Sequence, residues 1–84
     1  MSIVVFITVP NRKEANRIAK ELLKDKLAAC VNIVENVRSL FWWQGKVARA
    51  KEALLIVKTR KALMHKLIKK VKSLHSYAVP EIIA

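Results

Sequence analysis

The sequence has almost none of the residues that build long loops and covalent cross-links. Its 84 residues include one glycine, two prolines and one cysteine, Cys30. A single cysteine cannot form a disulfide within the chain, which excludes a disulfide-stapled secreted scaffold. With 54% of residues hydrophobic, the scarcity of loop formers predicts one compact domain over residues 1–84, with short connections.

Long apolar runs and leader signals are also lacking. No apolar run approaches the ~18 residues that a membrane-spanning helix needs. The apolar opening at residues 3–9 has no basic segment before it and stops at Pro10, so it is a poor signal peptide. Together with the single cysteine, these absences predict a cytoplasmic protein without a membrane partner.

Acidic residues are scarce, which bears on both catalysis and binding. Six acidic residues stand against seventeen basic ones, and the net charge is +11. Asp25 is the only aspartate, no serine, histidine and acid form a recognisable catalytic set, and no glycine-rich phosphate loop is present. We therefore expect that the protein is not an enzyme. The excess positive charge predicts only weak, non-specific binding of nucleic acid.

Hydrophobic periodicity predicts four strands and two helices. The strands are expected at residues 3–9, 29–43, 47–58 and 77–84. A first helix is expected at residues 12–26, with Asn11 and Glu14 as a capping box, and Thr59 is expected to cap a second helix. Pro80 places the last strand at a sheet edge. The residues predicted to form the buried stripes of the two helices are Ala15, Ile18, Ala19, Leu22 and Leu23, then Leu63, Leu67, Ile68, Val71 and Leu74.

The order of these elements is typical of one fold class. Strand, helix, strand, strand, helix, strand is the α+β arrangement of a ferredoxin-like βαββαβ sandwich. In this fold an antiparallel sheet carries two helices on one face. The face away from the helices therefore has no cover within the chain.

An aromatic stretch, LFWWQG at residues 40–45, lies where the second and third strands should turn, and Gln44-Gly45 suits a tight hairpin. Residues 29–43 would span roughly 50 Å if fully extended at ~3.3 Å per residue, whereas a helix of about 14 residues rises only ~21 Å. The hairpin should therefore project beyond the helices, with Phe41 and Trp43 on one side and Trp42 on the other. We expect another copy of the chain to cover these three aromatic residues.

Several short segments resemble one known family in order and spacing, over nearly the whole chain. They are Ala28-Ala29-Cys30-Val31-Asn32, Trp43, Gly45-Lys46, Glu52, Lys58-Thr59, His75, Tyr77 and Val79-Pro80-Glu81-Ile82-Ile83. The chain resembles the CutA family of divalent-cation tolerance proteins. The resemblance implies a ferredoxin-like fold, a homotrimer, and binding of copper or other divalent metal ions. Family members usually continue with a further strand and a terminal helix, which this sequence would lack.

His75, Cys30 and Glu81 are the candidate metal ligands. Imidazole and thiolate suit copper and zinc, and a carboxylate can complete such a site. No paired spacing such as CxxC or HxxxH is present, so the sequence does not indicate a closed site within one chain. Cys30 also lies in an apolar run that is typical of a small buried residue. His75, Tyr77 and Glu81 lie close in sequence and could line a small polar cleft.

Two other functions remain open from the sequence. RNA-recognition motifs share the predicted element order, but residues 47–58 contain neither the aromatics nor the glycine of their third strand. A trimeric small-ligand sensor of the PII kind shares the architecture, although no nucleotide-binding signature is present. We therefore predict a divalent-cation-binding protein, with a nucleic-acid-binding domain or a PII-like sensor as the alternatives.

Overall fold

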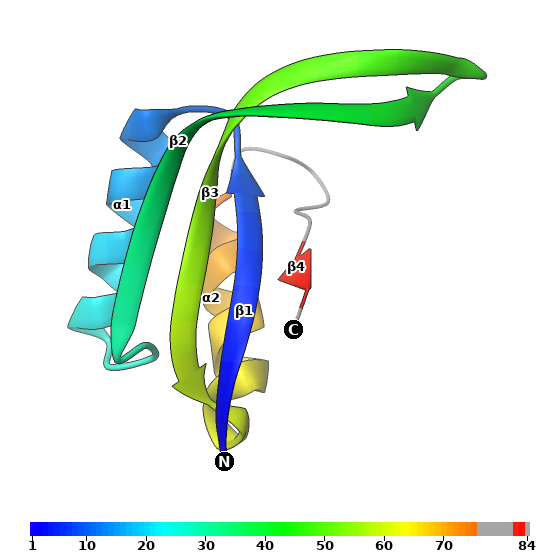
Figure 1. Cartoon of the computed structure of the whole chain (residues 1–84). Coiled ribbons are helices and arrows are strands. Elements are labelled where there is room, and N and C mark those ends of the chain that lie inside the picture. The colour runs from blue at the N-terminus through cyan, green and yellow to red at the C-terminus, as the bar shows by residue number, and fades with distance from the viewer. Residues whose placement is uncertain (76–81, 84) are drawn as a thin grey trace.

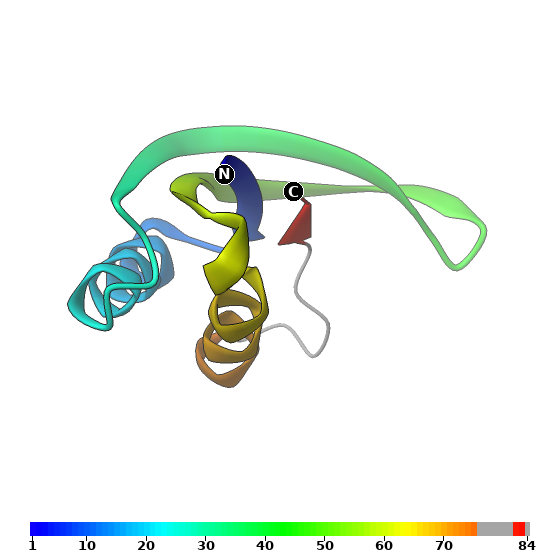
Figure 2. The same ribbon diagram turned by 90° about the horizontal axis from the view of Figure 1, so that it is seen from below.

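The computed structural model of the chain describes residues 1–75 and 82–83 (Figure 1). In chain order its elements are β1 (Ser2–Val9), α1 (Arg12–Lys24), β2 (Cys30–Trp43), β3 (Lys46–Arg60), the 3₁₀ turn η1 (Lys61–Leu63), α2 (Met64–Leu74) and β4 (Ile82–Ile83). The strands form an antiparallel sheet in the order β2-β3-β1-β4. Both helices lie on one face of it (Figures 1 and 2). The predicted α+β fold is confirmed.

The core lies between the sheet and the helices. Val5, Ile7 and Val9 of β1 and Leu55 and Val57 of β3 are fully buried there. The helices contribute the buried side chains of Ala15, Ile18, Ala19, Leu22, Leu67 and Val71. Because successive strand residues point to opposite faces, the strand residues between the buried ones face away from the helices.

The first helix begins as predicted and ends earlier. The Oδ1 atom of Asn11 accepts a hydrogen bond from the backbone N–H of Glu14 at 2.9 Å. The helix ends at Lys24, two residues before the predicted end, and Lys26 has a φ of 56° that is incompatible with a continued right-handed helix. Leu23 is exposed, because it follows the buried Leu22 by more than a quarter of a helical turn.

The prediction that Thr59 caps the second helix is wrong. Thr59 lies in β3 opposite Ile3, and its Oγ1 donates a hydrogen bond to the backbone carbonyl of Leu27 at 2.7 Å. The strand therefore continues through Arg60, and α2 begins only after η1, without a side-chain cap. In the described ranges no helix is long and apolar enough to span a bilayer.

The last predicted strand is described only in part. Ile82 and Ile83 form β4, which pairs with Ile7 and Phe6 at the edge of β1. β4 is an edge strand, as the position of Pro80 predicted. Pro80 itself lies outside the described residues, as do Tyr77 and Glu81.

The second and third strands form a long hairpin that projects past the helices (Figures 1 and 2). Its two-residue loop is Gln44-Gly45, and the φ values of 51° and 76° are those of the turn that best fits twisted strands. A bulge lies between Val34 and Val37, where Asn36 has a φ of 60°. We call residues 37–52, beyond this bulge, the arm. The predicted projecting hairpin is present.

The bulge also decides which side chains share a face along the arm. Val34 pairs with Leu54 and Val37 with Glu52, so β2 has one residue more than β3 between these pairs. Without the extra residue, every later side chain of β2 would point to the opposite face. With it, Phe41 and Trp43 lie on the same side as Val34.

Removing the Thr59 hydroxyl should destabilise the fold. In Thr59→Val the buried carbonyl of Leu27 loses its hydrogen-bond donor, so we expect the free energy of unfolding to fall by about 1–2 kcal/mol. Ser73→Ala is the control, because the Ser73 hydroxyl donates to the Lys70 carbonyl at an exposed position. Its loss should change the free energy by less than about 0.5 kcal/mol. Urea denaturation at one fixed protein concentration compares the two variants, and equal effects would contradict this account.

Candidate functional site

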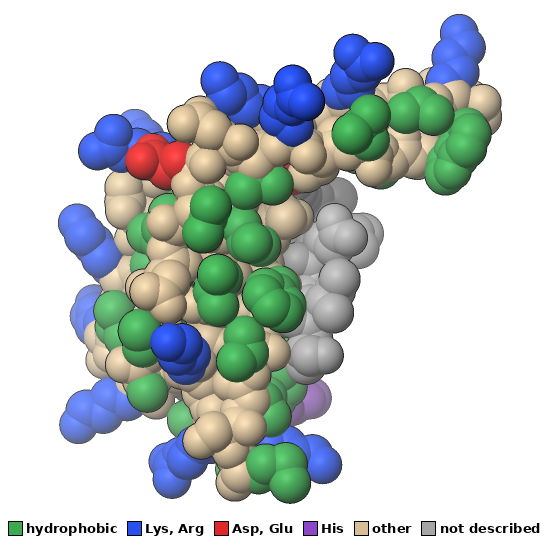
Figure 3. Space-filling view, in the orientation of Figure 1, with side chains coloured by type: hydrophobic (Ala, Val, Ile, Leu, Met, Phe, Trp, Pro, Cys, Tyr) green, Lys and Arg blue, Asp and Glu red, His purple; other side chains and the backbone are tan. Residues whose placement is uncertain are grey.

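The sheet face away from the helices is apolar and uncovered. Val4 and Phe6 of β1 and Val34 of β2 are exposed there, and Leu54 and Ile56 of β3 are half-buried. The register places these residues side by side, since Phe6 pairs with Ile56 and Val34 with Leu54. Apolar side chains cover this part of the molecule in Figure 3. We call these five residues the open face.

The aromatic residues of the arm are exposed in the single chain. Phe41, Trp42 and Trp43 are 43%, 77% and 63% exposed, and Leu40 and Val47 are also exposed. The register pairs Phe41 with Ala48, so Phe41 and Trp43 lie on the side that continues the open face, and Trp42 lies on the other side. The structure thus places Phe41 and Trp43 on the same side of the hairpin as the open face, beyond the pairs Val37–Glu52 and Ser39–Ala50. Their predicted role in an oligomer interface stays a prediction.

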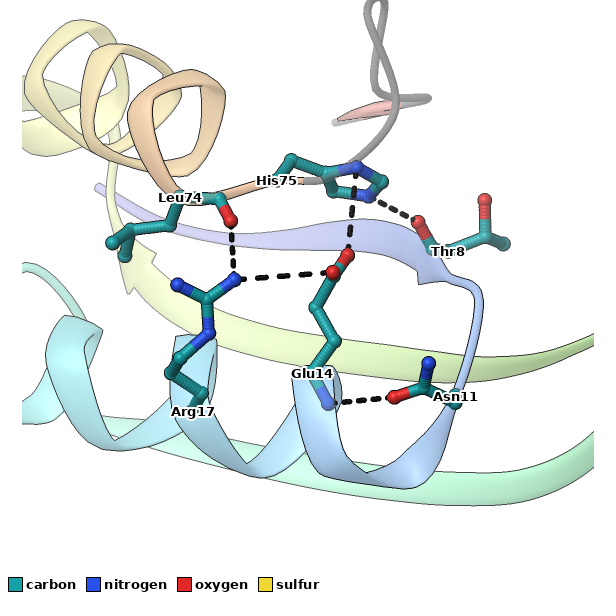
Figure 4. A network of polar contacts seen from close by, with 6 residues as sticks. All are labelled: Thr8, Asn11, Glu14, Arg17, Leu74 and His75. Carbon is teal, nitrogen blue, oxygen red and sulfur yellow. Dashed lines mark hydrogen bonds and ion pairs between the residues drawn. The ribbon is translucent and has the colours of Figure 1, made fainter.

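His75 belongs to a partly buried polar network at the helix side of the sheet (Figure 4). Its Nε2 lies 2.7 Å from the backbone carbonyl oxygen of Thr8, and its Nδ1 lies 3.7 Å from Oε2 of Glu14. Oε1 of Glu14 lies 3.8 Å from Nη2 of Arg17, and that nitrogen donates to the backbone carbonyl of Leu74 at 2.6 Å. The network therefore joins the end of β1, the first turn of α1 and the end of α2.

These contacts limit what His75 can do as a metal ligand. The His75 side chain has no solvent exposure, and both of its ring nitrogens lie beside protein oxygens. A metal ion would have to displace the Thr8 carbonyl or the Glu14 carboxylate before it could bind the ring. From the sequence, Glu14 is expected only as a capping residue. Its partner His75 is 61 residues away along the chain, beyond the reach of any local pattern.

Cys30 lies on the other side of the sheet from His75. It is half-buried, it pairs with Lys58, and its Sγ lies 3.9 Å from Oδ1 of Asn32. Lys58 in turn pairs with Val4, so the Cys30 side chain extends the open face. His75 contacts Thr8, four residues further along β1. The structure thus separates the two candidate ligands.

A complete metal site is not formed by the described part of one chain. Among those residues no three histidine, cysteine, aspartate or glutamate side chains gather closely enough to hold a metal ion. Glu81, the third candidate ligand, and Tyr77, the candidate cleft residue, lie outside the described residues. The metal-ligand predictions for His75, Cys30 and Glu81 therefore stay predictions.

The basic surface of α2 is mostly solvated, with one exception. Nζ of Lys70 lies 3.0 Å from Oδ2 of Asp25 and 3.7 Å from Oε2 of Glu21, which links α2 to the end of α1. The hydrogen bond to Asp25 and the negative charges of both acids raise the pKa of Lys70 above its ordinary value. His65, Lys66, Lys69 and Lys72 are exposed.

Comparisons with known proteins agree on one family. The family model described as CutA1 divalent ion tolerance protein matches residues 3–84. Protein CutA 1, chloroplastic, from Oryza sativa is 52% identical over 83 residues, which are 99% of this chain and 47% of the relative. The divalent-cation tolerance protein CutA of Thermus thermophilus is 51% identical over 84 residues, which are 100% of this chain and 82% of the relative.

Solved structures give the same result. The Thermus thermophilus divalent cation tolerance protein matches with a TM-score of 0.96 and 51% identity, covering 99% of this chain and 81% of that one. The periplasmic divalent cation tolerance protein CutA of Archaeoglobus fulgidus matches with a TM-score of 0.95 and 48% identity, covering 99% and 80%. The chain spans about half the length of the plant relatives, 47% of the rice protein and 46% of the one from Arabidopsis thaliana.

The prediction of a cytoplasmic protein is contradicted by these relatives. The rice and Arabidopsis proteins are chloroplastic, and the Archaeoglobus structure is described as periplasmic. The physical reason is that one cysteine cannot pair within the chain in any compartment, so its presence does not report the redox state of the surroundings. What the relatives share is their family, and the match over residues 3–84 shows that this chain belongs to the CutA family of divalent-cation tolerance proteins.

Proposed function

We propose that the chain assembles into a homotrimer, and that the assembled protein binds copper or another divalent cation without catalysing a reaction. The observation that carries the proposal is the uncovered apolar open face, together with the exposed aromatic residues on the same side of the arm. These residues include Val4, Phe6 and Val34 on the sheet and Phe41 and Trp43 on the arm. An apolar surface of this extent is typical of an interface between proteins.

The shape of the subunit favours a closed ring over a simple pair. The arm extends from the end of the sheet where β2 and β3 continue past the helices, whereas the open face lies over the centre of the sheet (Figure 1). An arm that packs on the open face of a neighbour makes a contact between two different surfaces, and such contacts close into a ring when the rotation allows. The family resemblance supports three as the number of copies.

The cation is the second part of the proposal, supported by the family's description as divalent-cation tolerance proteins. Of the two candidate ligands in the described residues, Cys30 fits better, because its thiol lies on the open face, where Sγ is 3.9 Å from Oδ1 of Asn32. A thiolate suits copper. His75 could bind a metal ion only after its ring loses the contact with the Thr8 carbonyl or with the Glu14 carboxylate. Since the described part of one chain gathers no three ligands, a site at Cys30 would draw others from a second copy or from Glu81.

Oligomer formation should depend on the open face. Phe6→Glu and Trp43→Glu each place a charge in the proposed interface, where desolvating it is unfavourable, so we expect both variants to sediment as monomers. The wild type should sediment at three times the chain mass. Leu23→Glu is the matched control, because Leu23 is 44% exposed on α1, close to the 42% of Phe6, but lies on the helix side.

Analytical ultracentrifugation at micromolar concentration decides this prediction. A wild-type monomer would contradict it, and so would a Phe6→Glu or Trp43→Glu variant that keeps the wild-type mass.

Copper binding should depend on the Cys30 thiol and on assembly. We expect Cys30→Ser to bind copper at least about tenfold more weakly, since a hydroxyl is a poor ligand for a soft metal. If the copper site needs ligands from two copies, the copper affinity of the monomeric Phe6→Glu variant should fall by a similar factor. His65→Ala is the control, because His65 is exposed on α2, away from the open face.

Calorimetric titration of protein of known oligomeric state measures these affinities. Cys30→Ser with the affinity of the wild type would remove Cys30 from the site. If only the His65→Ala variant has a lower copper affinity, copper binds adventitiously at the surface instead.

A further inference from the structure

The side of the arm opposite Phe41 and Trp43 carries a basic groove. Its volume is about 440 Å³, and it is lined by Arg38, Ser39, Leu40, Arg49, Ala50 and Lys51. In Figure 3, Lys and Arg side chains stand along the upper side of the arm, whereas apolar side chains lie near its tip. Three of the six lining residues are cationic and none is acidic.

The strand register shows how the groove is built. Arg38 pairs with Lys51, and Leu40 pairs with Arg49. Because alternate residues of a strand share a face, these four side chains stand on one side of the arm. Ser39 and Ala50 form the pair between them, and their side chains point to the opposite side, so their backbone makes the floor.

The three cations of the groove have no acidic partner among the described residues. Four of the acidic residues there are engaged elsewhere: Glu14 with Arg17 and His75, Glu21 and Asp25 with Lys70, and Glu35 with Arg12. Glu52, the fifth, is buried, and its position beside Lys51 in the strand places it on the other side of the arm. In the described part of the chain, therefore, no ion pair neutralises Arg38, Arg49 or Lys51, and the nearest acidic side chains, Glu35 and Glu52, line a separate hollow on which Lys51 also borders.

This arrangement destabilises the free protein. Like charges directly opposite each other on paired strands repel, and Arg38 faces Lys51 in this way. Arg49 adds a third positive charge on the same side of β3. Its Cα lies two residues from that of Lys51, a rise of about 7 Å along the strand. An anion bound between the three side chains would remove this repulsion.

We propose that the basic groove binds a small anion that carries two or three linked phosphoryl groups. The guanidinium groups of Arg38 and Arg49 each present a planar fork of donors, which matches the oxygens of a phosphoryl group in a bidentate way. Lys51 supplies a third positive charge for an anion that carries several negative ones. The Leu40 side chain forms an apolar wall beside them.

The groove lies apart from the proposed trimer contact at Phe41 and Trp43. The trimer contact uses the side of the arm that continues the open face, which bears Phe41 and Trp43. The groove lies on the other side, near the base of the arm. Trp42 shares that side but lies near the loop at the tip, so a contact at Trp42 does not itself cover the groove. The two roles are therefore separable by mutation.

Inorganic triphosphate is the probe that tests the proposal. Calorimetric titration into the full chain at physiological ionic strength, about 0.15 M, should show saturable binding. Arg38→Gln/Arg49→Gln should weaken it at least about tenfold, because both guanidinium forks are lost. Lys66→Gln/Lys69→Gln is the matched control: it removes the same charge from two exposed positions on α2, and it should change the affinity by less than about twofold.

The thermal midpoint provides a second readout that distinguishes a binding role from a structural one. Arg38→Gln should leave the midpoint of the unliganded protein unchanged or higher, because it removes a cross-strand repulsion. Triphosphate should raise the midpoint of the wild type but not that of the Arg38→Gln/Arg49→Gln variant.

Four results would overturn the proposal. They are an absence of wild-type binding at millimolar triphosphate, equal losses in the two double variants, a lower midpoint for unliganded Arg38→Gln, and binding of a DNA duplex at the groove without binding of triphosphate. Equal losses of triphosphate affinity in the two double variants would mean that binding depends only on the net charge of the protein. Duplex binding alone would mean that the groove takes nucleic acid rather than a small anion.

Discussion

A four-stranded sheet has two faces, and two helices can cover only one of them. This constraint shapes the rest of the molecule. The helix side takes the core, where Val5, Ile7 and Leu55 are fully buried, while the residues that alternate with them leave Phe6 and Val34 in contact with solvent. The bulge after Val34 then keeps Phe41 and Trp43 on that same uncovered side. A chain of 84 residues has no further element in its described part to cover this surface, so assembly is the economical solution.

The two sides of the arm differ in chemistry because the strands alternate. One side bears Phe41 and Trp43 beside the small residues Ala48 and Ala50, a shape that allows another sheet to approach closely. The other side bears the three cations of the basic groove. Since the helices extend no further than the base of the arm, both sides are available, and one hairpin can serve self-association and anion binding at once (Figure 1).

Local patterns predicted much of this fold, and long-range contacts account for what they missed. The helix start at Asn11 and the turn at Gln44-Gly45 depend on neighbouring residues, so the sequence was sufficient for them. Thr59 was misassigned because a threonine before a helix and one in a strand look alike locally, and its partner Leu27 is 32 residues away. Similarly, the position of Cys30 and His75 on opposite sides of the sheet depends on strand pairing and helix docking, which no spacing rule contains.

The environment of the tryptophans tests the central claim most directly, because Trp42 and Trp43 are the only ones and both lie on the arm. In a single chain they are 77% and 63% exposed, so their fluorescence would resemble that of tryptophan in water. If other copies cover the arm, the wild type should emit at shorter wavelength than the Phe6→Glu variant and should resist quenching by acrylamide. Identical long-wavelength emission and equal quenching of the two proteins would contradict the account.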